Sequence, residues 1–286
     1  MIIGIDLGGT HIKLGLVNNN IIIKKLTLNT EASKGKQRVI NNIIKGISLI
    51  KEGQKIKAIG IGSPGPLDYK KGIIIKTPNL PFRNVNLKKI IKNKFRVKVE
   101  VDNDANCAAL AEKIYGKYNK LDNFVVITLG TGIGSGAIFN GKLYHGGLFA
   151  TEFGHMIIKG GKDHCHLNHY SCLESLASCS VISREAKKVF GKKMMAIEVI
   201  ILCDKGNKKA KKIVDGVSKY LGIGLANIFN MLDPEIILID KGLRGKGKYF
   251  LNKLNKEVKK NVMTKFKIAF SDLDDAGILG AAALVK

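Results

Sequence analysis

The chain contains the same strand–turn–strand pattern twice. The segments IIGIDLGGTHIKLGL and VVITLGTGIGSGAI each run from an apolar strand through a Leu-Gly pair and a turn of small residues into a second strand. Aligning them places Asp6 opposite Thr128, an offset of 128 − 6 = 122 residues. A pattern repeated at this distance predicts two half-molecules of related fold, and the alternative is a chance match between two glycine hairpins.

The order of the remaining elements predicts a two-lobed α/β protein. In the first half we expect antiparallel strands at 1–6, 11–17 and 21–28, further strands at 56–62 and 97–102, and helices at 39–51, 87–95 and 105–116. In the second half we expect strands at 123–130, 133–139 and 234–240, an Asn140-Gly141 hairpin turn, helices over most of 173–231 and a closing helix at 276–285. The predicted domains are an N-terminal lobe at 1–118, to which segment 275–286 returns, and a larger C-terminal lobe at 119–274.

The composition and the start of the chain predict a cytoplasmic protein. The five cysteines lack the even spacing of a disulfide framework, which indicates a reducing compartment. No apolar run approaches the roughly 20 residues of a membrane span, and the opening MIIGIDLGG lacks the charged start of a signal peptide. We therefore expect no membrane partner.

The net charge of +25 raises the question of nucleic-acid binding. Binding patches cluster their cations and interleave aromatic residues, whereas here the lysines are spread along the chain and tryptophan is absent. The denser runs at 88–98 and 205–212 are typical of solvated helix faces and turns. We expect no specific nucleic-acid partner.

Two glycine-rich segments resemble nucleotide motifs but lack a required part. GIGSPG at 60–65 has the spacing of a dinucleotide fingerprint, yet Pro64 and Pro66 prevent the helix that holds a pyrophosphate. GLRGKGKY at 242–249 resembles a P-loop, but Tyr249 stands where Ser or Thr must bind Mg²⁺. We interpret the second segment as a basic loop.

The turns in DLGGTHIK and LGTGIGSG are better candidates for a phosphate site. Each presents consecutive backbone N–H groups without a Cβ in the way, so two such turns facing each other can bind phosphate oxygens. Asp6 ends the strand before the first turn, and Mg²⁺ needs only one or two carboxylates. Together these features predict a nucleotide and Mg²⁺ in a cleft between the lobes.

The segment VDNDANCAALAE places Asp102, Asn103 and Asp104 where a strand runs into a helix. One interpretation is structural, since Asp and Asn are favoured helix caps and Asp104 could serve only as a cap. The other is catalytic: an alanine-rich helix permits close approach, and a carboxylate at its start can accept a proton from an alcohol that attacks a phosphoryl group.

The motifs DLGGT, GSPGPLD, TPNLP, DNDANCAALAE, TLGTGIGSG, EFGH and CLE occur in an order and spacing that resembles the ROK family of sugar kinases and sugar-responsive repressors. The resemblance covers nearly the whole chain. It implies an actin-like (ribonuclease H-like) ATPase fold of two lobes around a central cleft. It also implies transfer of the γ-phosphoryl group of ATP to a sugar hydroxyl, with ATP and Mg²⁺ as cofactors, and we expect a homodimer.

The resemblance also implies roles for single residues. Asp104 is similar to the family's general base on the sugar 6-hydroxyl. The positions similar to the sugar-binding set are Gly65, Asn79, Asn103, Glu152, His155 and Glu174. The positions similar to the nucleotide-binding set are Gly9, Thr10, Thr131 and Gly132, to which Asp6 is added as the magnesium ligand.

Two segments depart from the family. The family's zinc loop has one histidine and three cysteines, and those places hold His155, Cys165, Leu167 and Cys172, so one of the four ligands is lost. His166 or His169 could complete a Cys₂His₂ set, but we expect no structural zinc. In the adenosine region, Asp240-Lys241-Gly242 replaces paired glycines, which predicts weaker adenine packing.

The resemblance leaves several functions open. The first choice is a kinase for N-acetylmannosamine, and the alternatives are a glucokinase or an N-acetylglucosamine kinase. A repressor or a non-catalytic sugar sensor belongs to a different class. Repressors of the family carry an N-terminal helix-turn-helix extension, whereas the first strand here begins at Ile2, so we expect no DNA binding. A sensor would tolerate loss of Asp104, which is present, so a kinase is favoured over a sensor.

Overall fold

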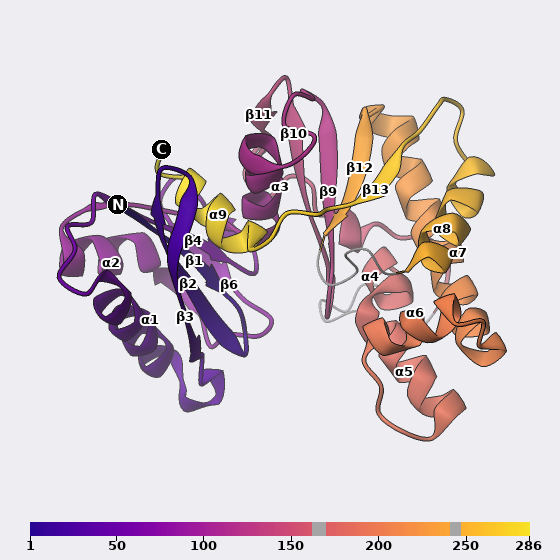
Figure 1. Cartoon of the computed structure of the whole chain (residues 1–286), viewed down its shortest axis with the longest axis horizontal. Coiled ribbons are helices and arrows are strands. Elements are labelled where there is room, and N and C mark those ends of the chain that lie inside the picture. Colours follow the sequence, from indigo (N-terminus) through magenta and orange to yellow (C-terminus); the bar gives the residue numbers. More distant parts are fainter. Residues whose placement is uncertain (162–169, 241–246) are drawn as a thin grey trace. The chain divides into compact units, whose positions relative to one another are not determined.

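A computed structural model describes residues 1–161, 170–240 and 247–286, which form two compact units (Figure 1). Unit 1 contains Met1–Lys120, Leu143–Ala150 and Leu273–Lys286, and unit 2 contains Leu121–Lys142 and Thr151–Asp272. Each unit has its own five-stranded sheet and its own apolar core. No helix among the described residues combines the length and apolar character needed to cross a bilayer.

The main sheet of unit 1 has the strand order β3-β2-β1-β4-β8. The hairpin strands β1 (Ile2–Leu7), β2 (His11–Asn18) and β3 (Ile21–Asn29) are antiparallel, and β4 (Ala58–Ser63) and β8 (Lys98–Asn103) run parallel to β1. A smaller antiparallel sheet contains β5 (Leu67–Asp68), β6 (Ile73–Lys76) and β7 (Arg83–Asn86). The helices of this unit are α1 (Lys36–Lys51), α2 (Leu87–Phe95), α3 (Asp104–Tyr115) and α9 (Ala276–Ala283).

Helices cover both faces of this sheet because β1 alternates large and small residues. Ile3 and Ile5 are fully buried in the core cluster that contains apolar residues of α1. The intervening Gly4 lies on the opposite face, where a Cβ would be 2.1 Å from the carbonyl oxygen of Ile278 in α9. At Gly60 of β4 a Cβ would be only 1.7 Å from the carbonyl oxygen of Ala281. These two glycines let α9 pack directly on the strands.

The sheet of unit 2 has the order β11-β10-β9-β12-β13. Its strands are β9 (Phe124–Leu129), β10 (Ile133–Phe139), β11 (Lys142–Leu143), β12 (Ile236–Asp240) and β13 (Ile268–Phe270). Its helices are α4 (Leu173–Ala177), α5 (Cys179–Phe190), α6 (Ala196–Asp204), α7 (Lys208–Leu232) and α8 (Lys248–Lys259). The predicted hairpin turn is confirmed, since Asn140 and Gly141 have φ values of 50° and 72°.

The two sheets repeat one topology. In each, the first strand pairs antiparallel with the second, the third strand lies beside the second, and two parallel strands follow on the other side of the first strand. The first strands start at Ile2 and Phe124 and end at Leu7 and Leu129, so both offsets are 124 − 2 = 129 − 7 = 122 residues. The offset predicted from the sequence therefore relates equivalent strands, and the match between the two hairpins is not a matter of chance.

Candidate active site

The carboxyl ends of three parallel strands meet at one edge of the unit 1 sheet. Asp6 of β1 is opposite Gly62 of β4, and Gly62 is opposite Asp102 of β8. Just beyond this register the strands end in a glycine turn, a loop and the start of α3. Ligands of open α/β sheets bind at this edge, and the predicted residues Asp6, Asn103 and Asp104 all lie on it.

Helix α3 begins at Asp104 and is capped by Asn103. The Oδ1 atom of Asn103 accepts hydrogen bonds from the backbone N–H groups of Ala105 at 2.8 Å and Asn106 at 3.4 Å. The structural interpretation of Asp104 as the cap is therefore wrong, because the preceding asparagine takes that role. The Asp104 carboxylate is half-buried in the first turn of the helix.

Asp102 is a buried carboxylate that the sequence prediction did not use. It is 4% exposed, and its Oδ1 accepts from the Asn103 backbone N–H at 2.7 Å and from the Asn106 carboxamide at 2.9 Å. Its Oδ2 is 2.6 Å from Nε2 of His145, whose ring stacks on Tyr69 with centroids 3.7 Å apart and 12° between the planes. The contacts within this cluster of Asp102, His145 and Tyr69 hold the end of β8 in place, and Asn103 and Asp104 follow directly in the chain.

Only a weak sequence signal could have found this cluster. Tyr69, Asp102 and His145 are far apart in the chain and belong to no shared motif. An aspartate that ends an apolar strand is itself a signal, because a buried carboxylate requires hydrogen-bond donors. That rule predicts partners for Asp102 without saying which they are.

The turn between β1 and β2 is fixed by hydrogen bonds and close packing. The Thr30 hydroxyl donates to the Gly8 carbonyl at 2.7 Å, and the Thr30 N–H donates to the Thr10 carbonyl at 2.9 Å. A Cβ on Gly9 would lie 2.8 Å from Cβ of Asn79. The structure thus brings together Gly9, a predicted phosphate contact, and Asn79, a predicted sugar contact.

Two further predicted residues of unit 1 occupy constrained positions. Gly65 has a φ of 87°, and a Cβ there would be 2.2 Å from the carbonyl oxygen of Lys76. Asp6 packs against the start of α9, where a Cβ on Gly277 would be 2.8 Å from the carboxylate carbon. Glycine is therefore required at 65 both for its left-handed backbone and for space.

In unit 2, the turn between β9 and β10 lies against a buried glutamate. The Gly130 N–H donates to the Gly132 carbonyl at 3.0 Å, and the Ser180 hydroxyl donates to the Thr131 carbonyl at 2.7 Å. Glu174, 9% exposed, accepts from the Ile133 N–H at 2.9 Å through Oε2. A Cβ on Gly132 would be 2.1 Å from the same oxygen. The predicted phosphate residue Gly132 and the predicted sugar residue Glu174 are therefore in contact.

Glu152 and His155 lie close to β10, the strand that follows this turn. His155 Nε2 is 3.9 Å from Glu152 Oε2, and their side chains are 17% and 44% exposed, respectively. Between them in the chain, Gly154 packs so closely that a Cβ would be 2.0 Å from the carbonyl oxygen of Ile133. The unit 2 residues Thr131, Gly132, Glu152, His155 and Glu174 thus gather around one end of β10.

Cys179 lies next to the same turn, and its thiol is partly buried. Its backbone N–H donates to the Gly130 carbonyl at 3.0 Å. Burial raises the pKa of the thiol to about 11, because the thiolate would lose hydration. The raised pKa disfavours the thiolate, which is the nucleophilic form of cysteine.

Three sequence interpretations fall wholly or largely on residues that are not described. Cys165, Leu167 and both candidate histidines of the zinc loop lie within 162–169, whereas the loop's other two ligand positions, His155 and Cys172, are described. The adenosine and P-loop-like segments lie largely within 241–246. Outside these gaps, no three His, Cys, Asp or Glu side chains are grouped so as to hold a metal ion. The zinc and adenine expectations remain predictions.

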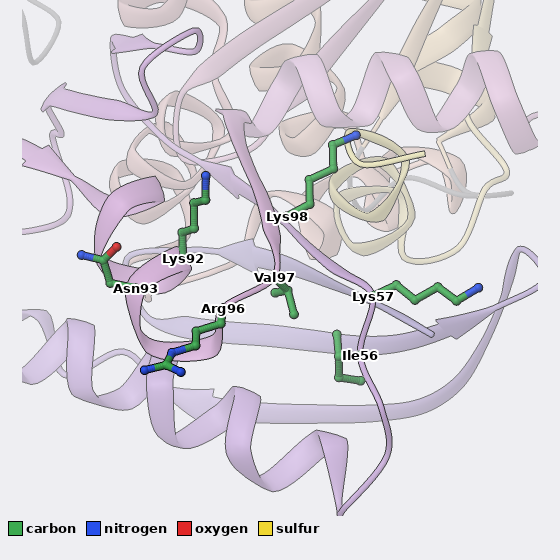
Figure 2. Close-up of a pocket in the computed structure, with 7 residues that line it drawn as sticks. All are labelled: Ile56, Lys57, Lys92, Asn93, Arg96, Val97 and Lys98. Carbon is green, nitrogen blue, oxygen red and sulfur yellow. The ribbon is translucent and has the colours of Figure 1, made fainter.

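A basic pocket of about 730 Å³ lies elsewhere in unit 1 (Figure 2). It is lined by Ile56, Lys57, Lys92, Asn93, Arg96, Val97 and Lys98. Figure 2 shows the four cationic side chains pointing away from one another instead of converging on a common point. This arrangement agrees with the interpretation of the 88–98 run as a solvated surface.

Two sheets of one strand order, each with a glycine turn next to acidic side chains, define a protein of the actin-like α/β class. The chain belongs to the ROK family, whose model matches residues 2–286. The fold class and the family resemblance predicted from the sequence are therefore confirmed.

The relatives include both enzymes and regulators. The glucokinase of Thermotoga maritima is 33% identical over 308 residues, with 100% of this chain and 97% of the relative covered. The xylose repressor of Caldicellulosiruptor bescii is 31% identical over 310 residues, with 99% of this chain and 77% of the relative covered.

Solved structures give the same picture. A ROK family glucokinase from Streptomyces griseus in complex with glucose and AMPPNP has a TM-score of 0.88 at 27% identity, covering 99% of this chain and 98% of that one. A Listeria monocytogenes protein proposed to be an N-acetylmannosamine kinase has a TM-score of 0.85 at 27% identity, covering 98% and 97%.

Proposed function

We propose that this protein is a sugar kinase that transfers the γ-phosphoryl group of ATP to the 6-hydroxyl of a hexose or N-acetylhexosamine. The observation that carries the proposal is the edge of unit 1, where the Asp104 carboxylate starts a helix capped by another residue and shares the strand ends with Asp6. A carboxylate so placed suits a general base.

The proposed reaction assigns one step to Asp104. Its carboxylate accepts the proton of the sugar 6-hydroxyl while that oxygen forms a bond to the γ-phosphorus. The bond between the γ-phosphorus and the bridging oxygen breaks, and ADP leaves with that electron pair. Because phosphoryl transfer depends mainly on positioning and charge stabilisation, the remaining residues bind and orient the two substrates.

The other residues divide into three groups in this proposal. Sugar hydroxyls are bound by Gly65, Asn79, Asn103, Glu152, His155 and Glu174. Phosphate oxygens are bound by backbone N–H groups at Gly9, Thr10, Thr131 and Gly132. The Asp6 carboxylate at its strand end fits a magnesium ligand, and bound Mg²⁺ would neutralise charge on the β- and γ-phosphates.

The identity of the sugar is the finer part of the proposal. The resemblance of the sequence to the family favours N-acetylmannosamine, and the Listeria monocytogenes structure supports that choice. Glucose is the second candidate, supported by the Thermotoga maritima glucokinase and by the glucose-bound Streptomyces griseus structure. We place the enzyme in the cytoplasm, because its cysteine spacing suits a reducing compartment, and we propose a homodimer, which sedimentation tests.

A coupled assay tests this proposal. Purified protein with ATP and Mg²⁺ is screened against glucose, N-acetylglucosamine, N-acetylmannosamine and fructose, and ADP release is followed. Turnover on one of these sugars is expected. No turnover on any of them, together with saturable sugar binding by calorimetry, would support a sensor, and a specific DNA complex that survives moderate salt would support a repressor.

A further inference from the structure

Helix α7 contains three glycines, and close packing explains two of them. A Cβ on Gly222 would be 2.5 Å from Cβ of Glu257, and one on Gly224 would be 2.7 Å from Cδ2 of Leu173. Glycine is the poorest helix former after proline, so a glycine in the middle of a helix calls for such a reason. At Gly216 the reason is absent: among the described residues, no atom outside its own helix and its chain neighbours lies within 4 Å of the Cβ position, and its φ is not positive.

Gly216 instead lines a pocket within unit 2. Helices α4, α5 and the first half of α7 (Figure 1) border a cavity of about 570 Å³. This volume lies within the range of small-molecule sites, roughly 300 to 1,000 Å³. Four apolar residues of the lining, Leu176, Val181, Ile213 and Val217, are between 3% and 8% exposed, and a fifth, Val189, is 41% exposed. Gly216 is itself exposed, so it lies at the open edge of this lining, where a larger side chain would narrow the pocket.

The rim of the pocket is positively charged. Four exposed cations line it: Lys159, Arg184, Lys209 and Lys212. Among the described residues of the lining the one acid is Glu185, which accepts hydrogen bonds from Lys188 at 2.8 Å and from Arg184 at 3.2 Å, so its charge is already paired. The hydrogen bond from Lys188 contributes most to lowering the pKa of Glu185. Because the whole chain is basic, these cations alone would carry no inference, but here they line the same pocket as four buried apolar residues and a helix glycine with open space at its Cβ position.

We propose that this pocket binds a small amphipathic anion, an organic acid whose apolar body rests on Leu176, Val181, Ile213 and Val217 and whose acidic group faces the rim cations. The open Cβ position of Gly216 leaves room for the apolar body, and a larger side chain there would narrow the pocket. The site contains none of the residues assigned to the kinase reaction, so it stands or falls independently of the proposed function.

The test uses two probes and the full-length protein. Anilinonaphthalenesulfonate, an aromatic sulfonate, reports binding by fluorescence, and octanoate competes with it. We expect one saturable site per chain, and displacement by octanoate at about tenfold lower concentration than by uncharged octanol.

Two matched pairs of variants locate the site. Gly216→Leu narrows the pocket, and Lys187→Leu adds the same side chain to an exposed position of α5 outside it. Lys212→Ser removes a rim cation, and Lys208→Ser removes a cation from the same helix outside the pocket. We expect Gly216→Leu to weaken probe binding about tenfold or more, and Lys212→Ser to weaken octanoate binding about threefold, with both controls unchanged.

The melting temperature of Gly216→Leu and the sedimentation of the protein distinguish a narrowed pocket from a damaged fold. Because leucine is a better helix former than glycine, Gly216→Leu should melt at or above the wild-type temperature. Wild-type probe affinity in a folded Gly216→Leu protein would overturn the proposal. A wild-type protein that binds neither probe would also overturn the proposal. If sedimentation then showed that the wild type is a dimer and that Gly216→Leu dissociates it, the pocket would be occupied by a second copy of the chain.

Discussion

Replacing His145 with phenylalanine tests whether the buried cluster supports the proposed base. The substitution keeps an aromatic ring to stack on Tyr69 but removes the nitrogen 2.6 Å from Asp102 Oδ2. Asp102 retains its two donors on Oδ1, from Asn103 and Asn106, while Oδ2 loses its partner at a site only 4% exposed. A hydrogen bond to a charged group contributes about 1.5–3 kcal/mol, so the free energy of unfolding should fall by about 2 kcal/mol.

For a chain of 286 residues, that loss corresponds to a melting temperature roughly 4–8 °C lower. If Asp102 also orients the strand end before Asp104, kcat should fall by about tenfold to a hundredfold while the KM for sugar changes little. Differential scanning calorimetry and a coupled ADP assay measure the two effects.

Tyr69→Leu is the matched control, because it removes the ring contact but keeps the hydrogen bond. It should lower stability by about 0.5–1.5 kcal/mol and leave kcat near the wild-type value. In an Asp102→Asn background, His145→Phe should lower stability much less, since the charge it pairs with is gone. Wild-type melting and wild-type kcat in His145→Phe would refute the argument that this cluster positions the site.

Three further predictions concern unit 2 and the zinc loop. Gly132→Ala places a Cβ 2.1 Å from Glu174 Oε2 and should raise the KM for ATP about tenfold or more, whereas Gly130→Ala, which meets no atom within 4 Å, should leave it unchanged. Cys179 should react with iodoacetamide at pH 8 about a hundredfold more slowly than an ordinary thiol, because its pKa is raised from 9.0 to about 11; peptide mass mapping of the modified residue checks this rate. Purified untagged protein should contain well under one zinc per chain and melt at the same temperature after treatment with a chelator; stoichiometric zinc with a large drop in melting would contradict it.

Local sequence patterns predict the elements whose apolar period is long enough to be distinctive. The helix at 87–95 has the predicted bounds, and the strands of the two glycine hairpins differ from their predicted bounds by one residue or less at each end. In these elements the apolar residues that face the core recur with the period of a helix or of a strand, so the same pattern indicates both the type of element and its buried face.

Elements without such a period are missed. The small sheet of β5, β6 and β7 has strands of two to four residues, which are too short to show an alternation. Helix α8 follows a glycine-rich basic segment, and the sequence pattern predicts no helix there, although KYFLNKLNKEVK buries Phe250, Leu254 and Val258.

The residues of the candidate site also fall into two groups, those that a sequence motif predicts and those that it does not. Contiguous motifs predict Asp104, Asn103 and the two glycine turns, because neighbours in sequence share one loop or helix start. The contact of Glu174 with Gly132, and the cluster of Asp102 with His145, join residues 42 or 43 positions apart (174 − 132 = 42 and 145 − 102 = 43). Tertiary packing alone brings these residues together, and no spacing rule predicts it.

The most direct test of the proposed function is the turnover of Asp104→Asn on the best sugar from the screen. The substitution keeps the size of the side chain, and the helix cap stays intact because Asn103 supplies it. Calorimetry should therefore give sugar affinity close to that of the wild type. The coupled assay should give a kcat about 10² to 10⁴-fold lower, the usual contribution of a general base. Turnover near the wild-type rate would contradict the account, since the proton of the sugar hydroxyl would then leave by a route that does not involve Asp104.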